Sequence, residues 1–398
     1  MNFIFLSPNF PKTYWNFCRS LKNNGIRVLG IGDENYDALS QELRESIDEY
    51  FRVSSLENYE EVYSACAFFA YKYGRIDWIE SNNEYWLERD ARLRTDFNVN
   101  SGLKEDRISY IKYKSQMKKF YKRAGVPVAR YHLVTNLKEG LAFVQKVGYP
   151  VIVKPDNGVG ASATYRISNK QELEQFYNAL PTITYIMEEY VDGTIVSYDG
   201  IAGKNKEIIF ETEHIYPDSI MDLVNEQKDV WFYSKVEIDE DLKKIGRRVI
   251  QTFDTNSRFF HTEYFRLRED KPGLGKKGQL VGLEVNMRPP GGYIPDMIDF
   301  AHDISVYQIW ANMIAYNDGR YDKEHKVYSS VYAAKRKQYR YVHSNTQIYE
   351  KYEKNIMMHE TMPDVFANAM GDDAIMARFD DEKEAIAFAK FVLKRKKQ

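Results

Sequence analysis

The sequence predicts an α/β region at the N-terminus followed by α+β regions over the rest of the chain. Near the N-terminus, β-rich and helix-like segments alternate as two strand–helix–strand units, which is the pattern of an open parallel sheet. Beyond about residue 104, strands and short helices follow one another without that regular order. With 398 residues, 43% of them hydrophobic, the chain exceeds one ordinary core, so two or three packed domains are expected.

The N-terminal region is expected to be a parallel α/β layer of about 100 residues. Its strand–helix–strand units are predicted at 3–6, 13–24 and 26–31, and again at 50–53, 59–71 and 76–80. No Gly-x-Gly-x-x-Gly motif follows the first strand, so dinucleotide binding has no support there. Packing support, or one wall of a substrate site, is the default role of this layer.

Charge and hydropathy exclude several classes of protein. The 56 Lys+Arg and 58 Asp+Glu residues give a formal net charge of -2, so no general attraction to nucleic acid or anionic membranes is expected. Neither a signal-peptide pattern nor a run of about 18 apolar residues occurs, which predicts a cytoplasmic protein. Cys18 and Cys66 lie in helix-like patterns and are expected to be buried free thiols without a chemical role.

A helix is predicted at 112–123, because the pattern stops at Gly125 with Pro127 close behind. Lys114 lies in this lysine-rich segment, where a solvated helix face is the simplest interpretation and contact with a ligand is the alternative.

A strand that ends at Lys154 precedes a glycine loop in YPVIVKPDNGVGASATYRI, residues 149–167. Pro155 keeps Lys154 extended, and Gly158 and Gly160 would let backbone N–H groups close over phosphate oxygens. The segment is not a Walker A loop, because no Gly-Lys-Ser/Thr follows and a second strand stands in place of the helix. Taken alone, an ordinary hairpin turn explains the same residues equally well.

The segment IMEEYVDG, residues 186–193, is an apolar strand that turns abruptly polar. It could offer backbone groups to an adenine edge and a carboxylate to a ribose, although a strand that leaves the core into a turn fits it as well.

Polar side chains alternate along LEVNMRPPGG, residues 283–292. In an extended chain, residues two apart share a face, so Glu284, Asn286 and Arg288 point one way. The strand RFFHTEYFRL, residues 258–267, lies across the Gly/Pro/Lys loop 269–278. A hairpin centred on that loop places Glu263 opposite Glu284, to within a residue or two.

Two facing carboxylates on one sheet face are unfavourable unless a cation lies between them. Glu263, Glu284 and the amide oxygen of Asn286 are hard ligands that suit Mg²⁺ or Mn²⁺, with water and phosphate completing the coordination. Arg288, one pleat further, could reach a transferred phosphoryl group or its acceptor. The alternative is a surface ladder of ion pairs with neighbouring arginines, which would not need the amide between the charges.

After about Gly319, a third stretch ends in a strand, a helix that Asp380 or Asp381 is expected to cap, and a basic KRKK tail. The tail is interpreted as a solvated end that suits the helix dipole, and the basic run at 334–343 is weak evidence for nucleic acid.

In their order along the chain, these motifs resemble those of the ATP-grasp superfamily, over roughly residues 104–300. The order is a helix lysine ahead of AGVP, PVIVKP with its glycine loop, MEEYVDG, HTEY and LEVNMR. The resemblance implies a Rossmann-like pre-ATP-grasp α/β domain at 1–103, followed by a two-lobed ATP-grasp fold at 104–318. Its small lobe would span about 115–190 and its large lobe about 191–318, and an α+β segment at 319–398 would complete the large lobe.

The resemblance also implies a role for each matching residue. Lys114 and Lys154 match the two phosphate lysines, and residues 156–162 match the mobile phosphate lid. The implied catalytic residues are Arg288, beside the transferred phosphate, and Lys154. The implied metal ligands are Glu263, Glu284 and Asn286, and the implied nucleotide-binding residues are Lys114, Lys154, Gly158, Gly160, Ala161, Ser162, Glu188, Glu189, Val191 and Asp192.

Two departures from the family pattern bear on the substrates. Ile195 stands where many members carry a Glu for the ribose, which leaves Asp192 or Asp199 for that contact. After Arg288, PPGGYIPD replaces the Gln-Val-Glu-His run of bicarbonate-phosphorylating members such as biotin carboxylase, and the Ser-rich run of carbamoyl phosphate synthase. This Gly-Gly followed by Ile-Pro resembles the branch of carboxylate–amine ligases that join amino acids or related small acids.

The resemblance therefore implies an enzyme: an ADP-forming carboxylate–amine ligase that makes an amide or peptide-like C–N bond through an acyl phosphate, with ATP and Mg²⁺ or Mn²⁺. Its expected partners are small-molecule carboxylate and amine substrates, without nucleic acid or membrane, and the chain is compatible with a homodimer. His214 and Lys235 are candidates to bind an acid, although structural or surface roles are the simpler interpretation. The alternatives are a bicarbonate- or formate-activating ATP-grasp enzyme and a non-catalytic nucleotide-binding sensor.

Overall fold

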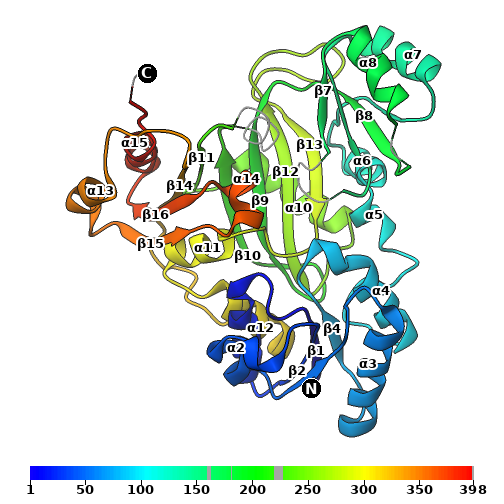
Figure 1. Ribbon diagram of the computed structural model, residues 1–398, viewed down its shortest axis with the longest axis vertical. Coiled ribbons are helices and arrows are strands. Elements are labelled where there is room, and N and C mark those ends of the chain that lie inside the picture. The colour runs from blue at the N-terminus through cyan, green and yellow to red at the C-terminus, as the bar shows by residue number, and fades with distance from the viewer. Residues whose placement is uncertain (159–162, 181, 219–226, 397–398) are drawn as a thin grey trace.

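The computed structural model describes residues 1–158, 163–180, 182–218 and 227–396. Three β-sheets organise these residues (Figure 1). A parallel sheet forms the N-terminal layer at the lower end of the view, and a small antiparallel sheet forms a lobe at the upper right. The eight-stranded sheet in the middle, whose paired strands are all antiparallel, connects them.

The N-terminal layer has the strand order β3-β2-β1-β4, in the elements β1 (Asn2–Leu6), β2 (Arg27–Gly32), β3 (Glu49–Arg52) and β4 (Trp78–Glu80). Both faces of β1 are apolar: Phe3 and Phe5 pack in one core with α1 (Trp15–Asn23), and Ile4 and Leu6 pack in another with α3 (Tyr59–Tyr73). Helices α2 (Gln41–Ser46) and α4 (Leu87–Asp96) complete the layer. The expected strand–helix–strand units are confirmed, with their ends shifted by one or two residues.

The small lobe is an antiparallel sheet in the order β5-β8-β6-β7, formed by β5 (Tyr131–Leu133), β8 (Tyr185–Glu189), β6 (Val151–Pro155) and β7 (Tyr165–Ile167). Helices α7 (Leu137–Val147) and α8 (Lys170–Asn178) each begin after an asparagine whose side chain accepts a backbone N–H. Val151, Val153 and Met187 share a core with these helices. Because side chains alternate along a strand, Lys154 and Glu188 point to the opposite face.

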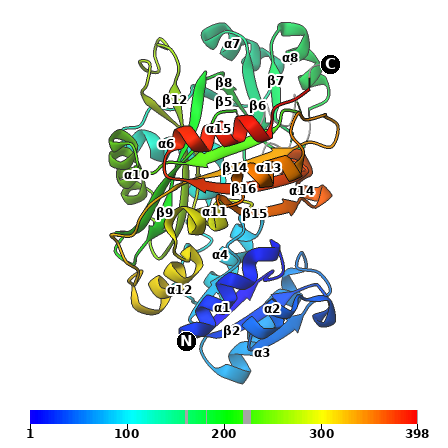
Figure 2. The same ribbon diagram turned by 90° about the vertical axis from the view of Figure 1, so that its left-hand side faces the viewer.

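The large sheet has the order β13-β12-β9-β10-β11-β14-β16-β15. Its strands are β13 (Leu280–Asn286), β12 (Arg258–Leu267), β9 (Gly193–Ala202), β10 (Ile208–Tyr216), β11 (Val230–Ser234), β14 (Ser329–Lys335), β16 (Asp373–Phe379) and β15 (Ile356–Thr361). One face packs against α6 (Lys114–Arg123) and α10 (Glu240–Thr252), and the other against α11 (Ile294–His302) and α12 (Val306–Tyr316). Helix α12 also lies beside α1, so it joins the sheet to the N-terminal layer (Figure 2).

The C-terminal residues continue the large sheet. They supply β14, β15 and β16, together with α13 (Asn345–Tyr352), α14 (Asp364–Met370) and α15 (Glu382–Val392), which packs on β14. The expected cap of the last helix is confirmed, because the Asp381 side chain accepts the backbone N–H groups of Lys383 and Glu384.

The helix expected at 112–123 is broken in the structure. A short helix α5 (Ser109–Lys112) ends before Tyr113, which is extended, and α6 then begins at Lys114. The physical reason is a cap from the neighbouring loop, because the Asp156 carboxylate accepts both the backbone N–H and the hydroxyl of Ser115, each at 2.7 Å.

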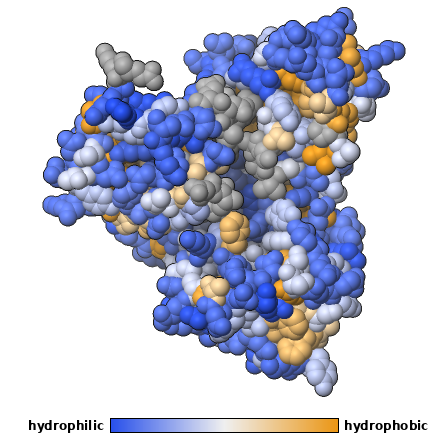
Figure 3. Space-filling view, in the orientation of Figure 1, coloured by the Kyte–Doolittle hydropathy of each residue, from blue (hydrophilic) through white to orange (hydrophobic). Residues whose placement is uncertain are grey.

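The sequence also bears on the two cysteines and on the polarity of the helices and of the surface. Cys18 and Cys66 are both buried and free, as expected. None of the helices among the described residues is long and apolar enough to cross a membrane. The face seen in Figure 3 is mostly hydrophilic, and apolar side chains gather at its lower end over the N-terminal layer.

Candidate active site

The site lies where the small lobe meets α6 and the large sheet, and a series of ion pairs connects its side chains. Lys154 Nζ at the end of β6 lies 3.2 Å from Glu188 Oε2 on β8. The other oxygen, Glu188 Oε1, lies 2.8 Å from Lys118 Nζ on α6. One turn earlier on the same helix face, Lys114 Nζ lies 3.4 Å from Glu284 Oε1 on β13. Three lysines and two carboxylates from four elements therefore converge.

Glu188 is the charged centre of the two-lysine contact. It is 4% exposed, and Lys118 is 1% exposed, so water does little to screen their interaction. Burial alone would raise the pKa of Glu188, but the charges of Lys118 and Lys154 hold it at about 2. Burial lowers the pKa of Lys118, and Glu188 opposes that effect. Glu188 is therefore an anion at neutral pH, and it forms ion pairs with two lysines, Lys118 and Lys154.

Lys114 connects the glycine loop to the acidic strands. It is 3% exposed, and its Nζ donates to the backbone oxygen of Gly158 at 2.8 Å. Burial would lower the pKa of Lys114, but Glu284 and Glu84 raise it. The interpretation of Lys114 as part of a solvated helix face is thus wrong, because the cap at Asp156 turns this end of α6 inward. The other predicted loop residues, Gly160, Ala161 and Ser162, lie outside the described residues.

The predicted hairpin register is confirmed. In the β12–β13 pair, Glu263 lies opposite Glu284 and His261 lies opposite Asn286, before a β-bulge shifts the register by one residue. Val285 and Met287 are buried in the core beneath α6, so alternation turns Glu284 and Asn286 to the other face. Tyr121 on α6 donates to the backbone oxygens of both Glu263 and Glu284, at 3.1 and 2.8 Å, and fixes the two strands at this point.

These residues fit a hard cation. The amide oxygen of Asn286 is buried, and no hydrogen-bond donor reaches it in the described part of the chain. Such an orphan acceptor beside two facing carboxylates is the oxygen-only donor set that suits Mg²⁺. No group of three or more His, Cys, Asp or Glu side chains arranged for a metal occurs among the described residues. A metal at Glu263, Glu284 and Asn286 would therefore complete its coordination with phosphate and water.

Behind Glu263 lies a buried histidine that the sequence interpretation missed. His261 Nε2 lies 3.1 Å from Glu263 Oε1, and its Nδ1 lies 2.5 Å from Asp199 Oδ1. Burial would lower the pKa of His261, but the two carboxylates, Asp199 above all, raise it to about 10. The second oxygen of Asp199 lies 2.7 Å from Nδ1 of His214, which is fully buried. His214 is thus part of this internal network, as the structural interpretation anticipated.

Arg288 does not point at an open space but contacts the N-terminal layer. Its Nη2 forms a short hydrogen bond with Glu84 Oε2, and its Nη1 donates to the backbone oxygen of Pro289 at 2.8 Å. Burial raises the pKa of Glu84, yet Arg288 together with Lys114 and Lys112 lowers it below its ordinary value. Glu84 is another residue that no sequence motif singled out.

The nucleotide-binding residues predicted at the end of β8 and directly after it have mixed environments. Glu189 pairs with Arg130 at 2.6 Å and Val191 is buried, whereas Asp192 is half-exposed and pairs with Arg268 at 3.2 Å. Ile195, at the position expected to be acidic, is buried. Asp199 is enclosed by histidines, so of the two acids considered for a ribose only Asp192 reaches the surface.

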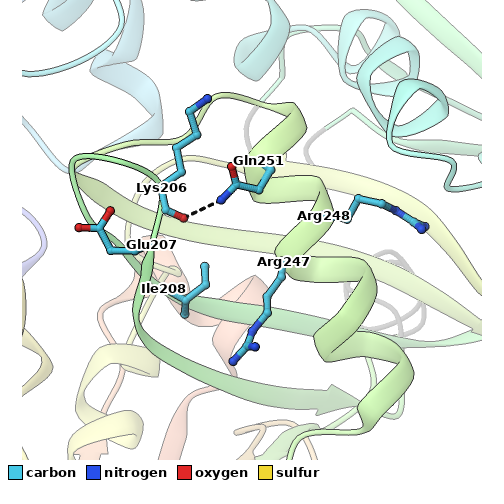
Figure 4. A pocket seen from close by; sticks show the side chains of 6 residues that line it. All are labelled: Lys206, Glu207, Ile208, Arg247, Arg248 and Gln251. Atoms are coloured by element: carbon cyan, nitrogen blue, oxygen red, sulfur yellow. Dashed lines mark hydrogen bonds between the residues drawn. The ribbon is translucent and has the colours of Figure 1, made fainter.

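Two cavities lie away from this site. One of about 410 Å³ lies between the start of β10 and the helix α10, where Gln251 donates to the backbone oxygen of Lys206 at 3.0 Å (Figure 4). The other, of about 480 Å³, is lined by His302 and by Lys235, which pairs with Asp239. Neither is lined by the residues predicted to hold phosphate or metal. Lys235 is thus separate from the converging lysines.

Comparisons with known proteins find relatives in sequence and in fold. Residues 113–191 match the family model described as the carbamoyl-phosphate synthase L chain, ATP binding domain. An L-arginine-specific L-amino acid ligase from Bacillus subtilis is 26% identical over 262 residues, which are 62% of this chain and 60% of that protein. The match thus spans less than two thirds of the length of that relative.

Two solved structures share the whole fold. The L-amino acid ligase from Bacillus licheniformis superimposes with a TM-score of 0.72 and 14% identity, over 100% of this chain and 98% of that one. The second is the biotin carboxylase domain of 2-oxoglutarate carboxylase from Hydrogenobacter thermophilus, a dimer in complex with MgADP, ADP and bicarbonate. It superimposes with a TM-score of 0.70 and 14% identity, over 99% of this chain and 90% of that one. At these identities the likeness establishes the fold.

Proposed function

The chain has the fold of the ATP-grasp superfamily, and on that premise we propose that it is an ADP-forming carboxylate–amine ligase. The observation that carries the proposal is the meeting of buried lysines with paired carboxylates: Lys114 lies 3.4 Å from Glu284, which faces Glu263 across the hairpin. Cations beside a hard-metal site suit the phosphates of a nucleoside triphosphate with its magnesium. The names of the amino acid ligases that it resembles support C–N bond formation.

In this proposal the small lobe holds the nucleotide. Lys154 and Lys114 bind phosphate oxygens beside Gly158, whose backbone oxygen accepts from Lys114. The adenine lies against the linker at 188–192. Because the Glu188 side chain is committed to two lysines, the adenine edge is contacted by backbone groups of the linker.

The acidic strands hold the metal. Glu263, Glu284 and Asn286 would bind Mg²⁺ or Mn²⁺, which when bound neutralises the charge of the β- and γ-phosphates. The network behind them fixes one of these ligands, because His261 bridges Glu263 and the buried Asp199. Tyr121 fixes the backbone of both strands.

The proposed reaction follows from the position of the lysines, Arg288 and the metal beside the β- and γ-phosphates. The carboxylate of one substrate attacks the γ-phosphorus, ADP leaves, and an acyl phosphate forms. The amine nitrogen of the second substrate then bonds to the acyl carbon while the bond from that carbon to the phosphate oxygen breaks. Arg288 and the lysines hold the phosphoryl oxygens in line, and the chain supplies no covalent nucleophile.

The substrates belong to the class of amino acids or related small acids. The PPGG run after Arg288 supports this, since it lacks the acidic and histidine groups of the bicarbonate-phosphorylating pattern. A cytoplasmic location and a homodimer belong to the same proposal. The biotin carboxylase relative is a dimer.

A screen of acid–amine pairs tests the proposal. The enzyme is incubated with Mg·ATP and pairs of amino acids, and the nucleotide products are resolved. We expect ADP that depends on both substrates, whereas AMP as the main product would contradict an acyl phosphate. ADP release driven by bicarbonate or formate alone would favour the alternative enzyme class, and ATP binding without turnover on any pair would favour a sensor. The Glu284→Gln variant is the control for contaminating ATPase.

A further inference from the structure

One short segment of the N-terminal layer reaches the turn that carries Arg288. The segment begins at Glu80, the last residue of β4, and continues to Glu84. Glu84, at the start of a 3₁₀ turn (Glu84–Trp86), is 6% exposed and accepts the short hydrogen bond from the Arg288 guanidinium. An arginine has four side-chain torsions and five donors, so a single buried carboxylate partner restricts its position strongly.

The same segment also holds the backbone in front of Arg288. Arg258 Nη1 donates to the backbone oxygen of Met287 at 3.2 Å. Arg258 Nη2 in turn lies 3.0 Å from Glu80 Oε2. A second buried arginine, Arg94, pairs with the same oxygen of Glu80 at 2.9 Å. Glu80 therefore fixes the main chain before Arg288 through Arg258, while Glu84 fixes the side chain directly.

The local charges exclude a simpler role for Glu84 as a proton acceptor. Its pKa lies below the ordinary value because Arg288, Lys114 and Lys112 outweigh the effect of burial. Lys112 also donates from Nζ to the backbone oxygen of Glu84 at 3.0 Å, which fixes the turn itself. A carboxylate surrounded by three cations is a poor base and a good anchor.

We propose that Glu84 is a positioning residue, which holds the Arg288 guanidinium beside the phosphoryl group that is transferred. The inference rests on the proposed function for its chemistry, but the anchoring itself is independent of any reaction. The N-terminal layer then has a role beyond packing, because it supplies one end of the contact that aligns the phosphoryl group. A misplacement of about 1 Å in such a group costs about 100-fold in rate.

The kinetic test is a double-variant cycle. Glu84→Gln keeps the size of the side chain and removes its charge, and we expect kcat to fall between about 10- and 100-fold with ATP binding unchanged within about twofold. In an Arg288→Gln background the same change should have little further effect on kcat, because the side-chain hydrogen bond of Glu84 is made with Arg288. The matched control is Glu49→Gln, which removes another ion-paired carboxylate of the N-terminal layer, 2.8 Å from Lys72 and away from Arg288.

A second measurement keeps the inference falsifiable without turnover. In protein labelled with ¹⁵N-arginine, the Nε–Hε signal of Arg288 is assigned by its loss in Arg288→Lys. We expect this group to be rigid in the wild type and mobile on the nanosecond timescale in Glu84→Gln. If Glu84→Gln does not fold, the same measurement is made on Glu84→Asp, whose side chain is shorter by one methylene group.

The outcomes separate this inference from the proposed function. A rigid Arg288 in the Glu84 variant, or a further loss of kcat in the Arg288→Gln background, overturns the positioning role. Absence of any ligase product from the wild type, with the mobility contrast still present, overturns the proposed function and leaves the anchoring supported.

Discussion

Exchanging Glu188 for Gln would remove the anion that holds Lys118 and Lys154. Glutamine is the neutral counterpart of a protonated carboxyl group, so the variant mimics protonation of Glu188 at a pH where the wild type is charged. Lys118, which is 1% exposed and 2.8 Å from Glu188, would then be left buried without its partner. Loss of one partner of a buried pair is strongly destabilising.

The magnitude follows from the displaced pKa. Because folding lowers the pKa of Glu188 from 4.5 to about 2, its ionised form stabilises the folded small lobe by about 3 kcal/mol at pH 7. A carboxyl group whose pKa is lowered by folding stabilises the folded state at any pH above the pKa of the unfolded state. This stabilisation is lost as the pH falls toward and below the pKa of the folded state. The stabilisation should therefore fall to about 1.4 kcal/mol at pH 3.

Hydrogen exchange of the backbone amides in β6 and β8 measures this opening free energy locally. At pH 7 we expect exchange about 300-fold faster in Glu188→Gln than in the wild type, and a ratio of about tenfold at pH 3. The control is Glu174→Gln on α8 of the same lobe, where an exposed pair with Lys170 at 3.5 Å should contribute little. Equal exchange rates in wild type and Glu188→Gln at pH 7, or a ratio independent of pH, would refute the reasoning.

The remaining predictions concern ligand binding. Lys154→Ala should weaken ATP binding by about 10- to 100-fold in calorimetry, because it removes a charge-assisted phosphate contact. Lys122→Ala, an exposed lysine on the same helix as Lys114, should leave it unchanged, and equal affinities would disprove the lysine assignment. Glu284→Gln should keep the fold but lose turnover at limiting Mg²⁺, because the metal site loses a formal charge. Normal turnover of that variant at low Mg²⁺ would show that the paired carboxylates do not hold the metal.

Local patterns predicted much of the fold because they are properties of neighbouring residues. Alternation and turn residues located the β12–β13 hairpin, and the loop between its strands fixed the register that places Glu263 opposite Glu284. The resemblance to ATP-grasp proteins is confirmed by the family match and the shared fold. The pairing of β14 with β11, which are about 100 residues apart, has no such local signal, since non-local strand pairing depends on the whole core.

The missed site residues show where single-segment reasoning ends. Lys118 carried a usable signal, because it lies one turn after Lys114 and must share its face. His261 likewise lies two residues before Glu263 on one strand face. Glu84 had no signal in its own segment, since its partner Arg288 lies in the turn after β13 and meets it only when the N-terminal layer packs on the large sheet. The assignments of metal ligands and nucleotide contacts stay predictions.

Transfer of oxygen from the substrate carboxylate to phosphate tests the central claim most directly. A carboxylate substrate labelled with ¹⁸O is coupled to its amine with Mg·ATP, and the released phosphate and the product are analysed by mass spectrometry. Attack on the γ-phosphorus followed by displacement requires one labelled oxygen to leave with the phosphate, and that is the result we expect. Label retained wholly in the coupled product would contradict the acyl phosphate, even if ADP is formed.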